Sequence, residues 1–263
     1  MTSTTLKAKR VLTSILVAAV WVGVWQVLAS LVGTDLLLPG PLDTFARLGE
    51  LAVTADFWST IAASMARILV GWLIGVFIGA ALAALTAMSH AVSAFFSPAM
   101  SVIKATPVAS FVMLAFVWIR GENLPVFCTV LMVLPLAWAN IHEGLLSADR
   151  DLIEMARAFK LDRSTIFRTI RLPALLPHLF GAIRVSLGFA WKAGVAAEVI
   201  SHVGRSIGGE LYDAKLYLET IDTFAWTAVI ILLSVLLEKL CAAAMNRAAV
   251  RFGAASGRAV SAK

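Results

Sequence analysis

The chain has 263 residues and a formal net charge of +6, and 60% of its residues are hydrophobic whereas only 14% are charged. Soluble domains carry about 45–50% apolar and about 25% charged residues. This composition, with a mean hydropathy of +0.89, therefore indicates a protein in contact with lipid. The same numbers exclude a disordered chain, a collagen-like repeat and a disulfide-rich secreted scaffold.

Six long apolar segments predict six membrane-spanning helices, because a helix needs about 20 mostly apolar residues to cross the roughly 30 Å hydrocarbon layer. The segments are continuously apolar rather than alternating, so the sequence predicts an all-α polytopic fold and not a barrel. The expected spans cover residues 11–32, 63–88, 91–119, 124–142, 179–200 and 223–246. Residues 11–250 form one transmembrane domain on this interpretation, between an N-terminus (1–10) and a C-terminal tail (251–263).

Lysines and arginines are distributed unequally between the two sides of the predicted bundle. Thirteen fall in the N-terminus, in segment 143–178 and from Arg247 to the C-terminus, and four fall on the other side. The positive-inside rule therefore predicts that both termini are cytoplasmic. Because the positive residues flank membrane segments, we expect them to meet anionic lipid and an acidic partner surface, not nucleic acid.

Segment 143–178, which we call the connecting segment, joins the fourth and fifth spans with 36 residues, whereas packed helices are usually joined by about 2–8. Its first half predicts a short helix with one apolar face, formed by Leu152, Met155, Ala156 and Phe159. Either Asp149 or Asp151 is expected to cap its start. On periodicity alone, such a helix fits docking on a partner and lying on the bilayer surface equally well.

The second half of the connecting segment predicts another short helix. Asp162 is the expected N-cap, and Ile166, Phe167 and Ile170 share one side. Pro173 is expected to end this helix, because a residue that precedes proline disfavours the α conformation.

The connecting segment resembles the EAA loop in the permease subunits of bacterial ABC importers. Glu154-Met155-Ala156, Lys160 and Ile170-Arg171-Leu172-Pro173 fit its pattern of Glu-Ala-Ala, three residues, Gly, nine residues and Ile-x-Leu-Pro. The resemblance implies a type I importer permease fold whose loop docks on a separate ATP-hydrolysing subunit. Its coupling residues would be Glu154, Met155, Ala156, Phe159, Lys160, Ile170, Leu172 and Pro173, with Glu154 bridging to the docking groove and Ala156 keeping the helix thin.

Two positions depart from the pattern of that loop. Met155 replaces the first alanine, which a helix tolerates. Lys160 replaces the glycine, which would adopt a positive-φ turn without steric cost. Lysine either accepts a cost of about 1 kcal/mol in that conformation or the turn is built differently.

Four further short motifs are similar to the nitrate, sulfonate, taurine and bicarbonate permease group. They are Leu38-Pro39-Gly40-Pro41, Ser64-Met65-Ala66-Arg67, Trp118-Ile119-Arg120-Gly121-Glu122 and Ala197-Glu198. This resemblance implies a permease of the bacterial inner membrane that works as a homodimer with ATPase subunits and an extracytoplasmic solute-binding protein. It also implies that this chain is no enzyme and binds no cofactor, with ATP held by the partner.

Three alternatives to that function remain open on the sequence. An ion-coupled secondary transporter would show an inverted repeat and paired intramembrane carboxylates, neither of which is obvious. A permease of the same kind for a heterocyclic vitamin precursor would look alike, and a non-transporting scaffold would not need intramembrane charges. No phosphate-binding G-x-x-x-x-G-K-[ST] motif and no catalytic or metal-binding motif occurs in the sequence.

Charged residues inside spans are costly and usually face a cavity or a partner. We expect Lys104 or Lys192 to line a conduit for an anion, and Glu198 to pair with Lys104 across helices; structural ion pairs explain these residues as well. Arg67 and Arg184 are interpreted as anchors near span ends. The Gly71-x-x-x-Gly75-x-x-x-Gly79 ladder favours close packing within the chain over a dimer contact.

Overall fold

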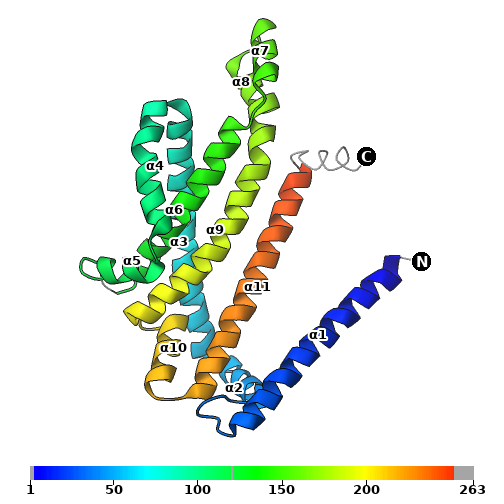
Figure 1. Cartoon of the computed structure of the whole chain (residues 1–263), viewed down its shortest axis with the longest axis vertical. Helices are drawn as coiled ribbons and strands as arrows, with labels where there is room; N and C mark the ends of the chain where they lie inside the picture. Colours follow the sequence, from blue (N-terminus) through cyan, green and yellow to red (C-terminus); the bar gives the residue numbers. More distant parts are fainter. Residues whose placement is uncertain (1–2, 120, 252–263) are drawn as a thin grey trace.

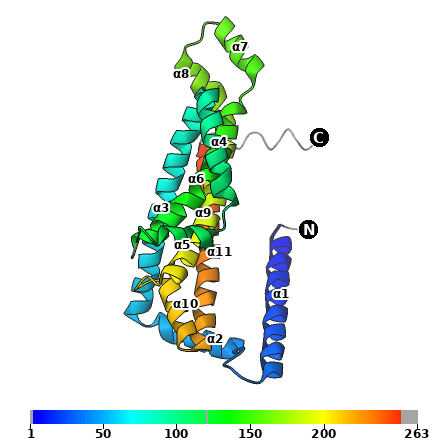
Figure 2. The same cartoon turned by 60° about the vertical axis from the view of Figure 1, so that its left-hand side comes forward.

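The computed structural model describes residues 3–119 and 121–251, and all regular structure in them is helical, which confirms the predicted all-α class (Figures 1 and 2). Most of the predicted C-terminal tail and Arg120 lie outside the described residues. In chain order the helices are α1 (Ser3–Val32), α2 (Pro41–Ala52), α3 (Ala55–Met88), α4 (His90–Ala105), α5 (Val108–Ala115), α6 (Asn123–Leu146), α7 (Arg150–Ala158), α8 (Arg163–Ile166), the π-helical turn η1 (Phe167–Arg171), α9 (Leu172–Ser201), α10 (Ile207–Leu216) and α11 (Thr220–Arg251).

Five of the described helical stretches are long and apolar enough to cross a membrane, and the bent pair α4–α5 would make a sixth. The five are α1, α3, α6, α11 and the stretch from α8 through α9. Two of these helices extend into the connecting segment, since α6 continues to Leu146 and α9 begins at Leu172. The part of the chain that stands between the two long helices is therefore residues 147–171.

The third predicted span, residues 91–119, is not one straight helix. It consists of α4 and α5, which are bent by 101° at Thr106 and Pro107. Thr106 has an extended backbone (φ −80°, ψ 130°), as expected for a residue before proline. In Figure 1, α5 lies across the bundle instead of continuing along the line of α4.

The glycine ladder of α3 packs against α6 within the chain, as we expected. A Cβ atom added to Gly71, Gly75 or Gly79 would lie 2.8 Å from a side chain of α6. Since real Cβ contacts are longer, the three glycines allow the two helix backbones to approach closely.

Pro173 does not end a helix, contrary to our expectation. Leu172 is helical (φ −63°, ψ −45°), and its N–H donates to the carbonyl of Phe167, five residues earlier. The proline lies in the first turn of α9, where a missing N–H is tolerated, so the π-helical turn η1 runs directly into α9. The second half of the connecting segment and the fifth span are thus one continuous helical stretch, Arg163–Ser201.

Helix α1 stands apart from the other long helices and is attached near its C-terminal end (Figures 1 and 2). There the Trp25 indole donates a 3.0 Å hydrogen bond to the carbonyl of Pro39 and stacks on Phe224. At the same end of the molecule, the Arg47 guanidinium of α2 pairs with Asp222 of α11. Helices α7 and α8 form the opposite end, toward which the N-terminus of α1 and the C-terminus of α11 point (Figure 1).

Candidate functional site

Helix α7 is capped as the sequence predicts. Asp149, and not Asp151, is the N-cap, because its Oδ1 accepts a 2.9 Å hydrogen bond from the backbone N–H of Asp151. This bond satisfies one of the N–H groups that the first turn leaves without a helical partner, and the negative carboxylate opposes the positive end of the helix dipole.

The predicted apolar face of α7 is divided between two environments. Ala156 is 3% exposed and packs inward, where its small side chain permits a close approach to the rest of the chain. Leu152, Met155 and Phe159 are 45%, 52% and 74% exposed. An apolar ridge at the tip of the molecule is therefore available for a partner, whereas Ala156 is not part of it.

The turn after α7 has the backbone conformation expected for glycine, although Lys160 occupies that position. Lys160 has φ +56°, so lysine adopts the left-handed conformation expected of the glycine that it replaces. The N–H of Lys160 donates to the carbonyl of Arg157 and that of Leu161 to the carbonyl of Ala156, at 2.9 and 3.0 Å. These two bonds form a Schellman cap, so the turn geometry is retained at a steric cost to lysine.

The following turn starts with Asp162, which caps α8 as predicted. Its carboxylate accepts hydrogen bonds from the backbone N–H and the hydroxyl of Thr165. These bonds hold the pKa of Asp162 below its usual value of 3.8. From this cap the helical stretch continues without interruption through Ile170, Leu172 and Pro173 into α9.

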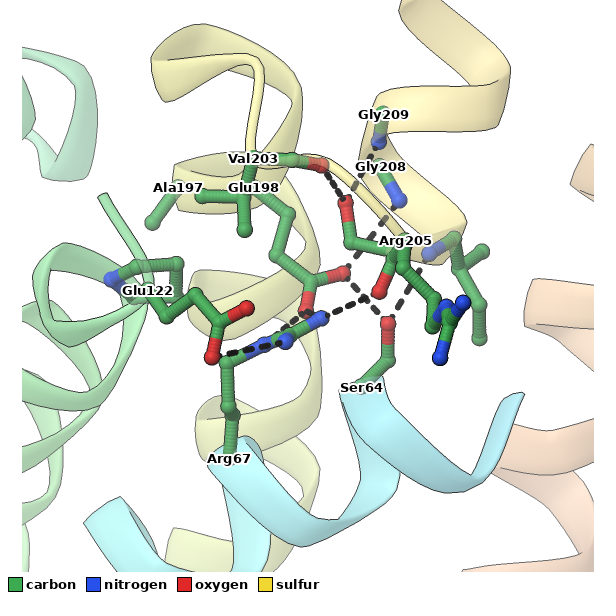
Figure 3. Close-up of polar contacts among 12 residues, drawn as sticks. Ser64, Arg67, Glu122, Ala197, Glu198, Val203, Arg205, Gly208 and Gly209 are labelled. Atoms are coloured by element: carbon green, nitrogen blue, oxygen red, sulfur yellow. Dashed lines mark hydrogen bonds and ion pairs between the residues drawn. The ribbon is translucent and has the colours of Figure 1, made fainter. Parts of the chain in front are cut away.

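A second polar cluster, which we call the Glu198 network, lies where α3, α9 and α10 meet (Figure 3). The Glu198 carboxylate is fully buried and accepts hydrogen bonds from the Ser64 hydroxyl at 2.8 Å and from Arg67 Nε at 3.2 Å. Arg67, whose side chain is 10% exposed, also donates to the carbonyl of Arg205 at 2.9 Å. Glu122, just before α6, approaches the same guanidinium at 3.9 Å.

The Glu198 network also closes the N-terminus of α10. The first three backbone N–H groups of α10 donate to Ser64 Oγ at 2.9 Å, to Glu198 Oε2 at 3.2 Å and to Ser206 Oγ at 2.8 Å. A helix start leaves these donors without helical partners, and an anion there is further stabilised by the helix dipole. The buried carboxylate therefore joins three helices and is itself neutralised by Arg67.

The backbone of the α9–α10 connection is shaped around this carboxylate. A Cβ atom on Gly208 would lie 2.4 Å from the Glu198 Cβ, so only glycine fits. His202 and Arg205 both adopt positive φ of 47°, which turns the chain from α9 into α10. The buried contacts of the Glu198 network hold the backbone of both residues in this strained conformation.

One expectation about intramembrane charges is wrong, since Glu198 pairs with Arg67 and not with Lys104. Arg67, which we interpreted as an anchor near a span end, is a partly buried partner of this carboxylate. Lys104 lies in the last turn of α4, where its side chain is exposed, and Lys192 is exposed on α9. Neither lysine forms an ion pair with another described residue.

The two clusters have no arrangement suited to covalent chemistry. The Glu198 carboxylate accepts three hydrogen bonds, from Ser64, Arg67 and Gly208, and is paired with the Arg67 guanidinium, so its oxygens already have partners. Within residues 3–119 and 121–251, no group of three or more His, Cys, Asp and Glu side chains could hold a metal ion. The geometry consists of an exposed apolar ridge at one end of the molecule and a hydrogen-bonded contact between three helices.

Comparison with known proteins gives a family and several relatives. The chain matches the family described as binding-protein-dependent transport system inner membrane component over residues 73–251. It is 30% identical over 202 residues to the putative aliphatic sulfonates transport permease protein SsuC of Escherichia coli K12, covering 76% of each chain. It is 26% identical over 238 residues to the taurine transport system permease protein TauC of the same strain, covering 88% of this chain and 86% of the relative. The bicarbonate transport system permease protein CmpB of Synechococcus elongatus is 28% identical over 206 residues, with 73% of this chain and 72% of the relative covered.

Solved structures of ABC transporters share the fold. A crystal structure of an amino acid ABC transporter with histidines matches with a TM-score of 0.59 and 17% identity, covering 77% of this chain and 96% of that one. An inward-facing structure of the MetNI methionine ABC transporter matches with a TM-score of 0.53 and 20% identity, covering 74% and 93%. At these identities the similarity concerns the fold alone, and it confirms the permease architecture that the sequence resemblance implied.

Proposed function

The chain belongs to the family of binding-protein-dependent transport system inner membrane components, and on this premise we propose that it is the membrane-spanning subunit of an ATP-driven importer for a small anion. Two copies would form the conduit, each docked on an ATP-hydrolysing subunit, and an extracytoplasmic binding protein would deliver the solute. Both termini and the connecting segment would face the cytoplasm, in agreement with the positive-inside count.

The observation that carries the proposal is the mechanical continuity from α7 to the bundle. Leu152, Met155 and Phe159 form an exposed apolar ridge at the tip of the molecule. A capped turn joins this ridge to Arg163–Ser201, a stretch that runs without a break into the bundle. A partner that gripped the ridge would therefore move α9 directly.

An ATP-driven cycle follows from this continuity. Closure of the ATPase subunits would move α7, and α9 would transmit that movement to the Glu198 network, which holds α3 and α10 against it. The joined helices would then swing the conduit from inward-facing to outward-facing. The chain supplies this transmission, and the ATP is bound and hydrolysed on the partner.

An anion is the proposed solute class. Three relatives are described as transporting aliphatic sulfonates, taurine and bicarbonate. Lys104 and Lys192 carry positive charge on helices of the bundle and are exposed, so each would attract an anion in a conduit formed by two copies. Family membership disfavours the ion-coupled secondary transporter, and a heterocyclic vitamin precursor is the solute that an uptake assay must separate from an anion.

The decisive experiment places a photo-crosslinking amino acid at single positions of the chain, co-expressed with the ATPase encoded beside it. Position 159, on the ridge, should crosslink to the ATPase. Position 215, exposed on α10 at the opposite end of the molecule (Figure 1), is the control and should crosslink much less. Equal crosslinking at both positions, or none at 159, contradicts the docking proposed here.

Uptake into proteoliposomes tests the solute. The reconstituted complex, loaded with ATP and supplied with its binding protein, should accumulate a sulfonate, taurine or bicarbonate. Accumulation of a neutral heterocycle in preference to all three anions would contradict the anion proposal but leave the permease function intact.

A further inference from the structure

A cavity of about 450 Å³ lies beneath α7, between that helix and the last turns of α3 and α6. Ile153 and Arg157 line it, whereas the exposed ridge residues Leu152, Met155 and Phe159 do not. The ridge and the cavity therefore share no lining residue and lie on different sides of α7.

The cavity wall is divided into an apolar part and a basic part. The apolar part includes Met88 at the end of α3, Leu146 at the end of α6 and Phe167 of η1. Met88 and Leu146 are exposed at the ends of helices that are long and apolar enough to span a membrane. In the orientation proposed above, this part of the wall would lie close to the bilayer.

The basic part of the wall carries an uncompensated positive charge. Arg150, Arg157 and Arg171 line the cavity together with a single carboxylate, that of Glu154. None of these four side chains forms an ion pair with another residue of the described chain. A net charge of about +2 therefore faces the cavity, and guanidinium groups are the preferred partners of phosphate oxygens.

We propose that this cavity binds an anionic glycerophospholipid of the inner leaflet. The headgroup phosphate lies among the three arginines, and the glycerol and upper acyl chains lie along Met88, Leu146 and Phe167. Free inorganic phosphate satisfies the basic wall alone, whereas a phospholipid covers both walls of the cavity. The site goes beyond the proposed transport function, and it relies on that proposal only for the orientation that places α7 at the cytoplasmic face.

The consequence of such binding is a lipid-dependent coupling helix. Arg150 and Arg157 belong to α7, Arg171 belongs to η1, and the apolar wall belongs to the bundle. A phosphate that contacts all three arginines ties α7 to the continuous helix behind it. Anionic lipid therefore stiffens the transmission between the ATPase and α9.

The experiment uses the chain purified with its ATPase partner and exchanged into nanodiscs of equal parts phosphatidylglycerol and phosphatidylcholine. Native mass spectrometry then measures the ratio of the two lipids retained. Arg171→Gln and Arg157→Gln should each lower the phosphatidylglycerol preference about fivefold, as expected for one arginine near a lipid phosphate. Arg168→Gln, which removes an exposed charge from the same turn outside the cavity, should leave the ratio unchanged.

A second variant keeps the test independent of the arginines. Met88→Trp fills the apolar wall without changing charge and should reduce retention of phosphatidylglycerol, while Arg171→Lys should restore part of the preference. An equal loss in Arg168→Gln and Arg171→Gln, or no loss in any cavity variant, overturns the proposal. Retention only after the ATPase is removed also overturns it, because the cavity would then be part of the ATPase seat.

A separate arm distinguishes lipid from a soluble oxyanion. Calorimetric titration of the detergent-solubilised complex with inorganic phosphate should show no saturable binding that depends on Arg171. Phosphate binding with this dependence, and no retained phosphatidylglycerol, overturns the lipid assignment. Failure of position 159 to crosslink to the ATPase would count against the transport proposal and would not alter the lipid ratios.

Discussion

Glu198, in α9, is a buried carboxylate whose hydrogen-bond donors come from two other helices. Ser64 and Arg67 of α3 and the backbone of Gly208 in α10 all donate to it. Replacing such a pair by apolar residues can be neutral, but removing one partner leaves a buried charge without compensation. The network therefore acts as a joint that is costly to break.

Arg67→Met should lower the free energy of unfolding by about 3–5 kcal/mol, because Glu198 then remains buried without its cation. Thermal or denaturant unfolding in detergent measures the loss. Lys192→Met is the matched control, since Lys192 is exposed and forms no ion pair with a described residue. A loss for Arg67→Met no greater than for the control would show that the pair contributes nothing.

Lys160 adopts a left-handed backbone conformation at a steric cost that glycine does not incur. Lys160→Gly should therefore stabilise the turn after α7 by about 1 kcal/mol. Lys160→Ala retains the Cβ atom and should give no such gain, so it separates backbone strain from loss of charge. Hydrogen exchange at the Leu161 N–H, which closes the Schellman cap, reports the difference, and equal exchange in both variants would contradict the strain.

The role of a single residue could be predicted from the sequence where its partner lies within a few residues along the chain. Asp149 and Asp162 cap their helices because a side chain and an N–H two or three residues later meet in any helix start. The partner of Glu198 was not predictable, because Lys104 and Arg67 both lie in apolar helices and the sequence holds no distance between helices. The spacing of Ser64 and Arg67, which places them on one face of α3, was the available signal.

At the scale of elements, α3 and α6 approach closely because the glycines of α3 at their contact have no Cβ atom. Gly75→Ala would place a Cβ atom 2.8 Å from the side chain of Val133 and should cost about 1–3 kcal/mol of unfolding free energy. Gly181→Ala in α9 meets nothing within 4 Å and should be neutral or stabilising by up to about 1 kcal/mol. Unfolding of both variants in the same detergent measures the contrast, and equal effects would contradict close packing.

The cap of α8 gives the connecting segment a pH dependence. The bonds from Thr165 lower the pKa of Asp162, so the ionised carboxylate stabilises the folded turn. This contribution is complete above the usual value of 3.8 and is lost as the pH falls through the lower folded value. Hydrogen exchange of the Thr165 N–H, corrected for intrinsic rates, should show the loss. Asp162→Asn should remove the pH dependence, and an unchanged acid profile would contradict it.

Helix boundaries were less predictable than helix existence. The apolar runs revealed the spans, yet α3 begins at Ala55 and α9 at Leu172, because amphipathic turns extend a helix beyond its apolar window. Pro173 misled the prediction because Leu172 keeps an α-helical backbone and the proline lies in the first turn of α9, where a missing N–H is tolerated. Proline was informative at Thr106–Pro107, where Thr106 has an extended backbone and the chain bends.

At the scale of the whole molecule, the two ends of the described chain are built differently. Helix α7 projects beyond the bundle, whereas α2 and α10 gather at the opposite end, where Arg47 pairs with Asp222 (Figure 1). Between them, the helical stretch Arg163–Ser201 extends from the connecting segment to the Glu198 network. Only 6% of the apolar windows of α1 and α11 is buried, so the rest of the described chain leaves most of the surface of these helices uncovered, as the proposed dimer in a membrane requires.

The exposed lysines of the bundle test whether that second copy completes an anion conduit. Lys104→Met and Lys192→Met should each reduce the rate of anion uptake by about tenfold, because a conduit lined by positive charge concentrates anions. Lys215→Met, an exposed lysine of α10 outside the long helices, is the control and should transport normally. Uptake into proteoliposomes at low and high salt measures the effect, which should shrink as salt screens the charge. Normal uptake by both variants at normal expression would mean that neither lysine faces the solute, and the conduit would have to be sought on other faces of α4 and α9.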